Sequence, residues 1–132
     1  MNNKAFTLIE LLVVVALLGI LSSIAVVSFQ GHIESTKRKA AELNLSTIHL
    51  AQQEYKSNNG SYYILAGCSS TSDSKIDTDL FDGIKKLSGD DDDPFQYCIL
   101  NTNGFTAKAV NPDTGCEITL EEDFTKERDN CN

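Results

Sequence analysis

The chain has 132 residues and a formal net charge of −8, a size that fits one domain with a modest hydrophobic core. The charge is unevenly spread: residues 1–68 hold five basic and four acidic side chains, whereas residues 69–132 hold six basic and fifteen acidic ones. An acidic surface repels nucleic acid phosphates, so this composition argues against DNA binding by the C-terminal half and favours solubility.

Residues 6–29 form an apolar stretch in which Glu10 is the only formally charged side chain. About 20 apolar residues span the core of a bilayer as a helix. Basic residues flank the stretch on both sides, so the positive-inside rule gives a mixed signal. The cysteines described below favour a cytoplasmic N-terminus and an external C-terminal domain.

An ordinary secretory signal peptide is the first alternative, with Ser23-Ile24-Ala25 as its cleavage site. The apolar stretch is too long for this interpretation, and it contains Glu10. A carboxylate inside a membrane helix costs about 2.5–3.5 kcal/mol on insertion scales and is by default functional. Lys4 is six residues from Glu10 and lies on a different face, so nothing nearby supplies a cation at helical spacing.

A cut between Ala5 and Phe6 would supply Glu10 with a nearby cation. The new α-amino group of Phe6 would lie about one turn from Glu10 in its own helix, or near the Glu10 of a neighbouring subunit. A buried charge pair of this kind gives little net stability, but it can fix the register between subunits.

The segment AFTLIELLVV, residues 5–14, resembles the class III signal of type IV prepilins and type II secretion pseudopilins. In that family a prepilin peptidase cuts before the Phe and N-methylates it, and a Glu shortly after the cut directs assembly. The resemblance therefore implies cleavage between Ala5 and Phe6, N-methylation of Phe6 and an assembly role for Glu10. It covers residues 1–30 closely and extends loosely to Tyr63.

Two positions depart from the family pattern. Ala5 stands where the leader usually ends in Gly, which predicts slower processing. Val27 stands where many members carry a Pro that breaks helical hydrogen bonding. Without that Pro, local melting of the helix would depend on Gly19 and Gly31.

The resemblance implies a structural subunit and not an enzyme, with no cofactor. Its partners would be the lipid bilayer before assembly, a prepilin peptidase, the inner-membrane assembly machinery, and then copies of itself and related pilins. The precursor would lie in the bacterial inner membrane and the product in an extracellular filament. A pseudopilin of a type II secretion system and a secreted soluble domain are the alternatives. Adhesion, twitching motility and DNA uptake are not distinguished by the sequence.

We divide the chain into a leader (residues 1–5), a transmembrane or filament-core half of one long helix (6–29), an amphipathic half (30–58) and a globular head (59–132). A helix over residues 6–58 would be about 80 Å long. The amphipathic half has a stripe of apolar residues at helical spacing, and Gly60 follows it as a stop signal. The stripe consists of Ala41, Leu45, Ile48, Ala51 and Tyr55.

The head is expected to complete an α+β fold, in which the long helix packs on a small antiparallel sheet of three to four strands. A loop over residues 59–76 precedes a short helix over Ile76–Leu87, with Leu80, Ile84 and Leu87 on one side. Period-two patterns separated by turn residues then predict strands over 95–100, 105–110 and 116–120. Residues 121–132 are expected to form a polar tail.

No catalytic motif is present in the sequence. His32 and His49 are too far apart for an i,i+4 metal pair and are interpreted as ordinary helix residues. The basic run 37–39 is expected either to contact lipid headgroups or a neighbour's acids, or to be a solvated face. The run Asp90, Asp91, Asp92 and Asp93 is a weak Ca²⁺ candidate, because it lacks the ligand spacing of an EF-hand.

All four cysteines, Cys68, Cys98, Cys116 and Cys131, lie in the C-terminal half, which indicates two disulfides and an oxidising compartment. Their separations are too wide for the close pairs of a zinc site. Four cysteines allow three pairings. We expect Cys116–Cys131, because the C-terminal loop of pilins is commonly disulfide-closed, and Cys68–Cys98. Each bond would be worth roughly 3–4 kcal/mol on the chain-entropy model.

Overall fold

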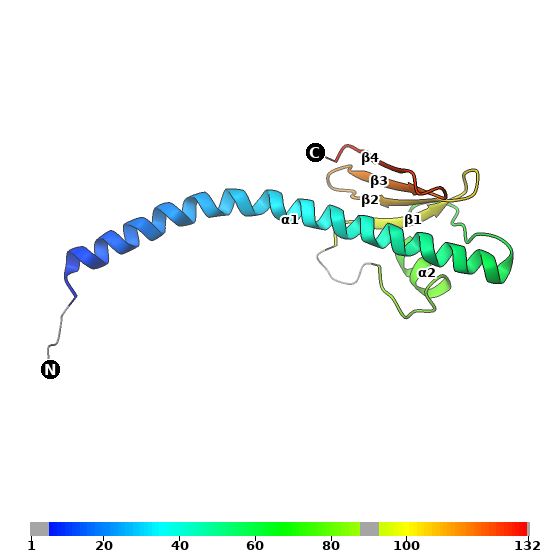
Figure 1. The fold of residues 1–132 in the computed structure, drawn as a ribbon, viewed down its shortest axis with the longest axis horizontal. Helices are drawn as coiled ribbons and strands as arrows, with labels where there is room; N and C mark the ends of the chain where they lie inside the picture. Colours follow the sequence, from blue (N-terminus) through cyan, green and yellow to red (C-terminus); the bar gives the residue numbers. More distant parts are fainter. Residues whose placement is uncertain (1–5, 88–92, 132) are drawn as a thin grey trace. The chain divides into compact units, whose positions relative to one another are not determined.

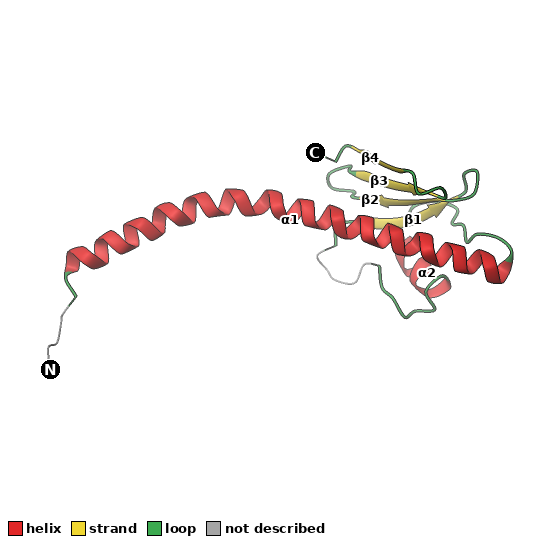
Figure 2. Cartoon of the chain, in the orientation of Figure 1, coloured by secondary structure: helices red, strands yellow, loops and turns green. Residues whose placement is uncertain are grey.

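The computed structural model describes residues 6–87 and 93–131. These residues form helices α1 (Leu8–Asn59) and α2 (Ser72–Asp79) and strands β1 (Gln96–Leu100), β2 (Thr106–Val110), β3 (Glu117–Glu121) and β4 (Lys126–Asp129) (Figures 1 and 2). The chain divides into two compact units, residues 1–36 and residues 37–132. The first unit holds the apolar part of α1, and the second holds the rest of α1 together with α2 and the strands.

The four strands form one antiparallel sheet in the order β1-β2-β3-β4. Cys98 pairs with Lys108, which in turn pairs with Thr119, and Thr119 pairs with Glu127. The α+β class and the antiparallel sheet predicted from the sequence are confirmed. The first three strands also lie within one residue of their predicted bounds.

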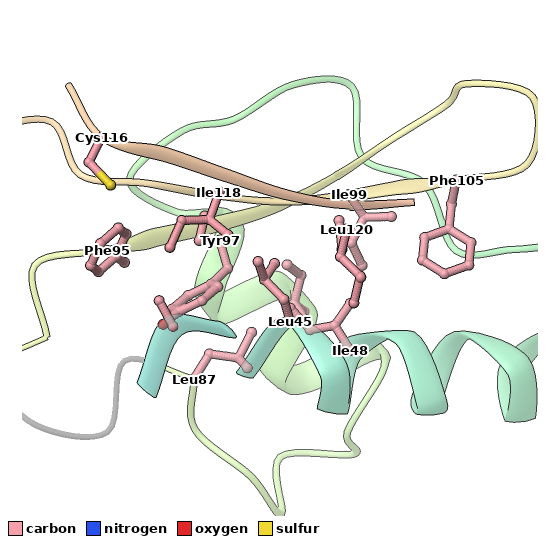
Figure 3. Close-up of a cluster of buried hydrophobic side chains, with 14 residues drawn as sticks. Leu45, Ile48, Leu87, Phe95, Tyr97, Ile99, Phe105, Cys116, Ile118 and Leu120 are labelled. Atoms are coloured by element: carbon pink, nitrogen blue, oxygen red, sulfur yellow. The ribbon is translucent and has the colours of Figure 1, made fainter. Parts of the chain in front are cut away.

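The core of the second unit lies between α1 and one face of the sheet (Figure 3). Its α1 members repeat at helical spacing, and its strand members alternate along the chain. Both sets have at most 2 % of their surface exposed: Ala41, Leu45 and Ile48 on α1, and Tyr97, Ile99, Ala107, Ala109, Ile118 and Leu120 on the strands. Burying a large apolar side chain contributes about 1.5–3 kcal/mol, so this layer holds the second unit together.

Two polar side chains of α1 are buried in the same layer and bond to loop backbone. Gln52 donates from Nε2 to the carbonyl of Tyr63 at 2.6 Å and accepts from the Tyr63 N–H at 2.9 Å. Its amide therefore bonds both backbone groups of Tyr63, as the backbone of a neighbouring β-strand does. His49 Nε2 lies 2.8 Å from the carbonyl oxygen of Glu122, in the turn before β4. These bonds satisfy loop groups that would be costly to bury unpaired.

The short helix predicted over Ile76–Leu87 is wrong in its position. Helix α2 begins at Ser72 and ends at Asp79, and the Gly83 N–H, at φ 71°, bonds back to the Asp77 carbonyl at 2.7 Å. Asp82, at φ 50°, is left-handed like Gly83, so no helix continues past α2 toward Leu87. Ile84 therefore does not continue the predicted apolar face and is 89 % exposed.

Strand β4 occupies part of the segment predicted to be a polar tail. All four of its residues are exposed, and its sequence KERD has no apolar alternation that could signal a strand. It pairs with β3 along its whole length, and Glu42 on α1 also accepts from Lys126 Nζ at 2.9 Å and pairs with Arg128. A fully charged outer strand also discourages edge-to-edge pairing of sheets.

Candidate functional site: the start of helix α1

Phe6 and Thr7 directly precede the first turn of α1, and Phe6 is 81 % exposed. Thr7 is the N-cap. Its hydroxyl oxygen accepts from the Glu10 N–H at 3.3 Å, and its carbonyl accepts from the Leu11 N–H at 3.3 Å. Ala5, the other residue of the predicted cleavage bond, lies outside the described residues.

The Glu10 carboxylate completes this cap from the other side. Its Oε2 accepts from the Thr7 N–H at 3.0 Å and from the Thr7 hydroxyl at 2.8 Å. This reciprocal arrangement of Thr and Glu three residues apart is a capping box. A carboxylate in the first turn also interacts favourably with the positive end of the helix dipole.

Thr7 is not among the site residues expected from the sequence, because it carries no charge that could pair with Glu10. The T-x-x-E spacing at a helix start was the signal that could have found it. The cap gives Glu10 hydrogen bonds within its own helix, but it supplies no positive charge. The carboxylate is therefore still without a counter-ion in the first turn of the described helix.

The helix that follows is apolar on every side. The segment Leu8–Ala25 has a mean hydropathy of 2.6 and is long and apolar enough to cross a membrane, and none of it is buried within the structure. Its hydroxyls are satisfied locally, since Ser22 donates to the Leu18 carbonyl and Ser23 to the Ile20 carbonyl, each at 2.7 Å. This segment thus needs cover from lipid or protein but presents few unsatisfied polar groups.

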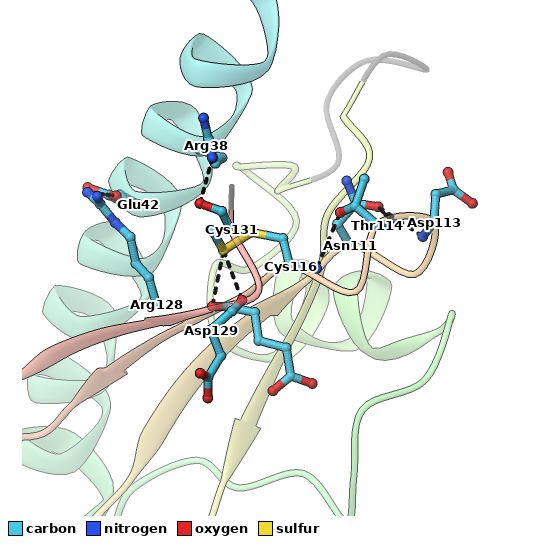
Figure 4. The surroundings of a disulfide bond; sticks show 10 residues. Arg38, Glu42, Asn111, Asp113, Thr114, Cys116, Arg128, Asp129 and Cys131 are labelled. Atoms are coloured by element: carbon cyan, nitrogen blue, oxygen red, sulfur yellow. Dashed lines mark hydrogen bonds and ion pairs between the residues drawn. A yellow bond between two sulfur atoms is a disulfide. The ribbon is translucent and has the colours of Figure 1, made fainter. Parts of the chain in front are cut away.

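The cysteines form two disulfides, Cys68–Cys98 and Cys116–Cys131, the pairing expected from the sequence. The first ties the loop before α2 to β1. The second closes the C-terminal end of the sheet, where Arg38 Nη1 donates to the Cys131 carbonyl at 2.8 Å (Figure 4). Arg38 is therefore bonded within the second unit, whereas Lys39 of the same basic run is exposed.

Asp93, the described residue of the acidic run 90–93, gives no support to the weak Ca²⁺ site predicted there. Asp93 Oδ1 accepts from the Phe95 N–H at 3.0 Å, and Oδ2 accepts from the Tyr97 hydroxyl at 2.9 Å, so both oxygens serve the fold. Asp90, Asp91 and Asp92 lie outside the described residues. Among the residues that are described, no group of three or more His, Cys, Asp or Glu side chains could hold a metal ion.

Comparison with known proteins agrees with this geometry. Residues 1–26 match the model of the prokaryotic N-terminal methylation motif. The chain is 40% identical over 61 residues to the type IV major pilin protein PilA of Myxococcus xanthus, and 34% identical over 61 residues to the type II secretion system core protein G of Pectobacterium carotovorum.

Each alignment covers 46% of this chain but only 28% of the pilin and 39% of the secretion protein, so the chain matches well under half the length of these curated relatives. No solved structure matches it significantly. The chain carries the prepilin N-terminal methylation motif and is homologous, over the aligned residues, to a type IV pilin and to a type II secretion pseudopilin.

Proposed function

We propose that this chain is a structural subunit of a type IV pilus-like filament. It is made as an inner-membrane precursor, and a prepilin peptidase cuts it between Ala5 and Phe6 and methylates Phe6. The inner-membrane assembly machinery then moves the subunit from the bilayer into an extracellular filament of copies of itself and related pilins.

The observation that carries this proposal is the placement of Glu10. It lies in the first turn of a helix whose segment Leu8–Ala25 is apolar and uncovered, and within the part of the chain that the structure describes its carboxylate is hydrogen-bonded but has no counter-ion. The hydrogen bonds from Thr7 lower the free-energy cost of holding the Glu10 charge in lipid, because they replace part of the hydration that the carboxylate loses there. The amino group of Phe6 on an adjacent subunit then supplies the missing charge during assembly and fixes the register.

A pseudopilin of a type II secretion system is the second candidate. The similarity to a type II secretion core protein favours it, and the N-terminal motif fits both classes. The Cys116–Cys131 bond supports the pilin, because the C-terminal loop of that class is commonly closed by a disulfide. A secreted soluble domain is the third candidate and would require a conventional cut near residue 26.

Sequencing the N-terminus of the mature chain tests the proposal. A chain that begins with methylated Phe6 is expected, whereas one that begins near residue 26 would support release of a soluble domain. Ala5→Arg should leave uncut precursor in the inner membrane, and Ala5→Gly, which restores the usual leader residue, should be cut at least as fast as the wild type. A mature Ala5→Arg chain that begins at Phe6 would contradict the proposal.

A further inference from the structure

Three pairs of neighbouring residues in this chain join an Asn or Asp to a glycine: Asn59-Gly60, Asp82-Gly83 and Asn103-Gly104. In such a pair the backbone nitrogen of the glycine can attack the side-chain carbonyl carbon of the residue before it, because glycine has no side chain to obstruct the approach. The attack closes a succinimide ring. It requires the glycine N–H to give up its proton, so a hydrogen bond that occupies this N–H protects the pair.

Two of the three pairs are protected in this way. The Gly60 N–H donates to the Lys56 carbonyl at 2.8 Å, at the end of α1, and the Gly83 N–H donates to a carbonyl of α2 at 2.7 Å. The side chain of Asn59 is also bonded, because its Nδ2 donates to the Tyr55 carbonyl at 3.0 Å. Succinimide formation at either pair must first break these hydrogen bonds.

The third pair, Asn103-Gly104, is open to the same reaction. It lies in the turn between β1 and β2, and the side chain of Asn103 is exposed. Among the residues that the structure describes, neither the Gly104 N–H nor the Asn103 amide has a hydrogen-bond partner. Both reacting groups are therefore free, and water reaches them.

The fold also requires the glycine of this pair. Gly104 has φ 124°, a conformation that side-chain-bearing residues rarely adopt, and a Cβ at this position would overlap the carboxylate of Glu122. That carboxylate is held in place, because it accepts from the Tyr62 hydroxyl and lies 3.5 Å from Lys56 Nζ. The reactivity of Asn103 is thus a consequence of how this turn is built.

We propose that Asn103 is a site of spontaneous deamidation in the folded protein, whereas hydrogen bonds protect the other two pairs. Water or hydroxide takes the Gly104 N–H proton, the nitrogen bonds to Cγ of Asn103, and the side-chain amide nitrogen leaves as ammonia. A water molecule then opens the ring at either carbonyl and leaves aspartate or isoaspartate. Water is the only co-reactant, and the reaction does not depend on the proposed filament.

Deamidation would change the chemistry of this end of the sheet. Asn103 lines a hollow of about 480 Å³ together with three carboxylates, those of Glu121, Glu122 and Asp123. The product adds a fourth negative charge there, and isoaspartate also lengthens the backbone of the turn by one carbon atom. Because turn geometry fixes the register of a hairpin, the adjoining end of the β1–β2 pairing should loosen.

Peptide mapping of the aged protein tests the proposal. The full chain is incubated in detergent at pH 8, then reduced, digested and analysed by mass spectrometry, with fragment spectra to locate each conversion of amide to acid. Conversion at Asn103 is expected, and conversion at Asn59 should be at least about tenfold slower, because its hydrogen bonds must open first. Isoaspartate, separated by chromatography, should appear at position 103 and not at Asp82.

The same chain, reduced and unfolded in urea, is the matched control, because Asn59 and Asn103 are both followed by glycine and should then react at similar rates. Asn103→Gln, whose longer side chain requires a larger ring, should stop the conversion at this position in the folded chain. Conversion of Asn59 as fast as that of Asn103 in the folded chain would overturn the inference. An Asn103 that reacts in urea but stays unchanged in the folded chain would overturn it as well.

Discussion

Thr7 and Glu10 hold each other at the start of α1: the N–H and the hydroxyl of Thr7 both donate to one carboxylate oxygen of Glu10, at 3.0 Å and 2.8 Å. The residue proposed to set register between subunits therefore also caps its own helix. Replacing Glu10 with Ala removes both roles at once. Thr7→Val and Glu10→Gln each change one of these roles and leave the other.

Thr7→Val should weaken the cap and leave the charge of Glu10 in place. Loss of an N-cap hydroxyl costs about 1 kcal/mol, so the first turn should fray. Hydrogen exchange of the full chain in detergent should then be faster at the amides of Glu10 and Leu11, whose partners are on Thr7. Thr7→Ser keeps the hydroxyl and should exchange as the wild type does. Equal exchange in all three chains would show that the cap does not form.

Glu42→Gln should loosen β4 without disturbing the other strands. The Glu42 side chain is 14% exposed and pairs with Lys126 and Arg128, while β4 buries no side chain of its own. Loss of such partly exposed pairs should cost about 1 kcal/mol, and 1 M salt should have a similar effect on the wild type. Faster hydrogen exchange confined to β4 is expected. Glu121→Gln, an exposed carboxylate on β3, should leave β4 protected, and unchanged exchange in Glu42→Gln would refute the role given to these pairs.

Asp73 should make the second unit less stable as the pH rises from about 4 to about 6. Burial raises the pKa of Asp73 to about 6, the nearby charges of Asp77 and Asp93 add to this, and the hydrogen bond from the Tyr97 N–H only partly opposes it. The folded state therefore keeps its proton at a pH where the unfolded chain has lost it, and the resulting stability disappears through this window.

Asp73→Asn should remove this dependence, because a neutral amide oxygen can still accept from Tyr97. The difference between variant and wild type should grow across the window to at most about 3 kcal/mol in favour of Asn. Urea unfolding of the full chain in detergent, at pH 4 and pH 7, measures it. Asp113→Asn, in an exposed turn, serves as the control, and a stability difference between Asp73→Asn and the wild type that does not grow between these two pH values would contradict the assignment.

The sequence predicts the elements whose pattern is periodic and locally determined. Of the predicted stripe, Ala41, Leu45 and Ile48 are buried, whereas Ala51 and Tyr55 are half-buried. The strands follow their alternation and turn residues. The start of α1 differs from the predicted residue 6, because Thr7 adopts the cap position and the helix begins at Leu8.

The errors lie where tertiary contacts decide the structure. Leu80, Ile84 and Leu87 fit one helix face in sequence, but α2 ends at Asp79 and the left-handed Asp82 and Gly83 follow, and only Leu87 among the three apolar residues is fully buried. Strand β4, with the sequence KERD, carries no apolar signal, and its side chains pair with Glu42, which is 84 residues away from Lys126 in the chain. Neither fact can be read from a local window of sequence.

The filament yield of Glu10→Gln shows whether the charge of Glu10 sets the register between subunits. Glutamine at this position of a capping box can still accept from the Thr7 N–H, so the helix start is kept while the charge is lost. Sheared filaments are compared with membrane-inserted subunits in cells that express only the variant, with Thr7→Val as the control for the cap. The account predicts inserted, processed Glu10→Gln subunits with few filaments, and a milder defect in Thr7→Val. Abundant normal filaments from Glu10→Gln subunits would show that the carboxylate charge does not set the register between subunits.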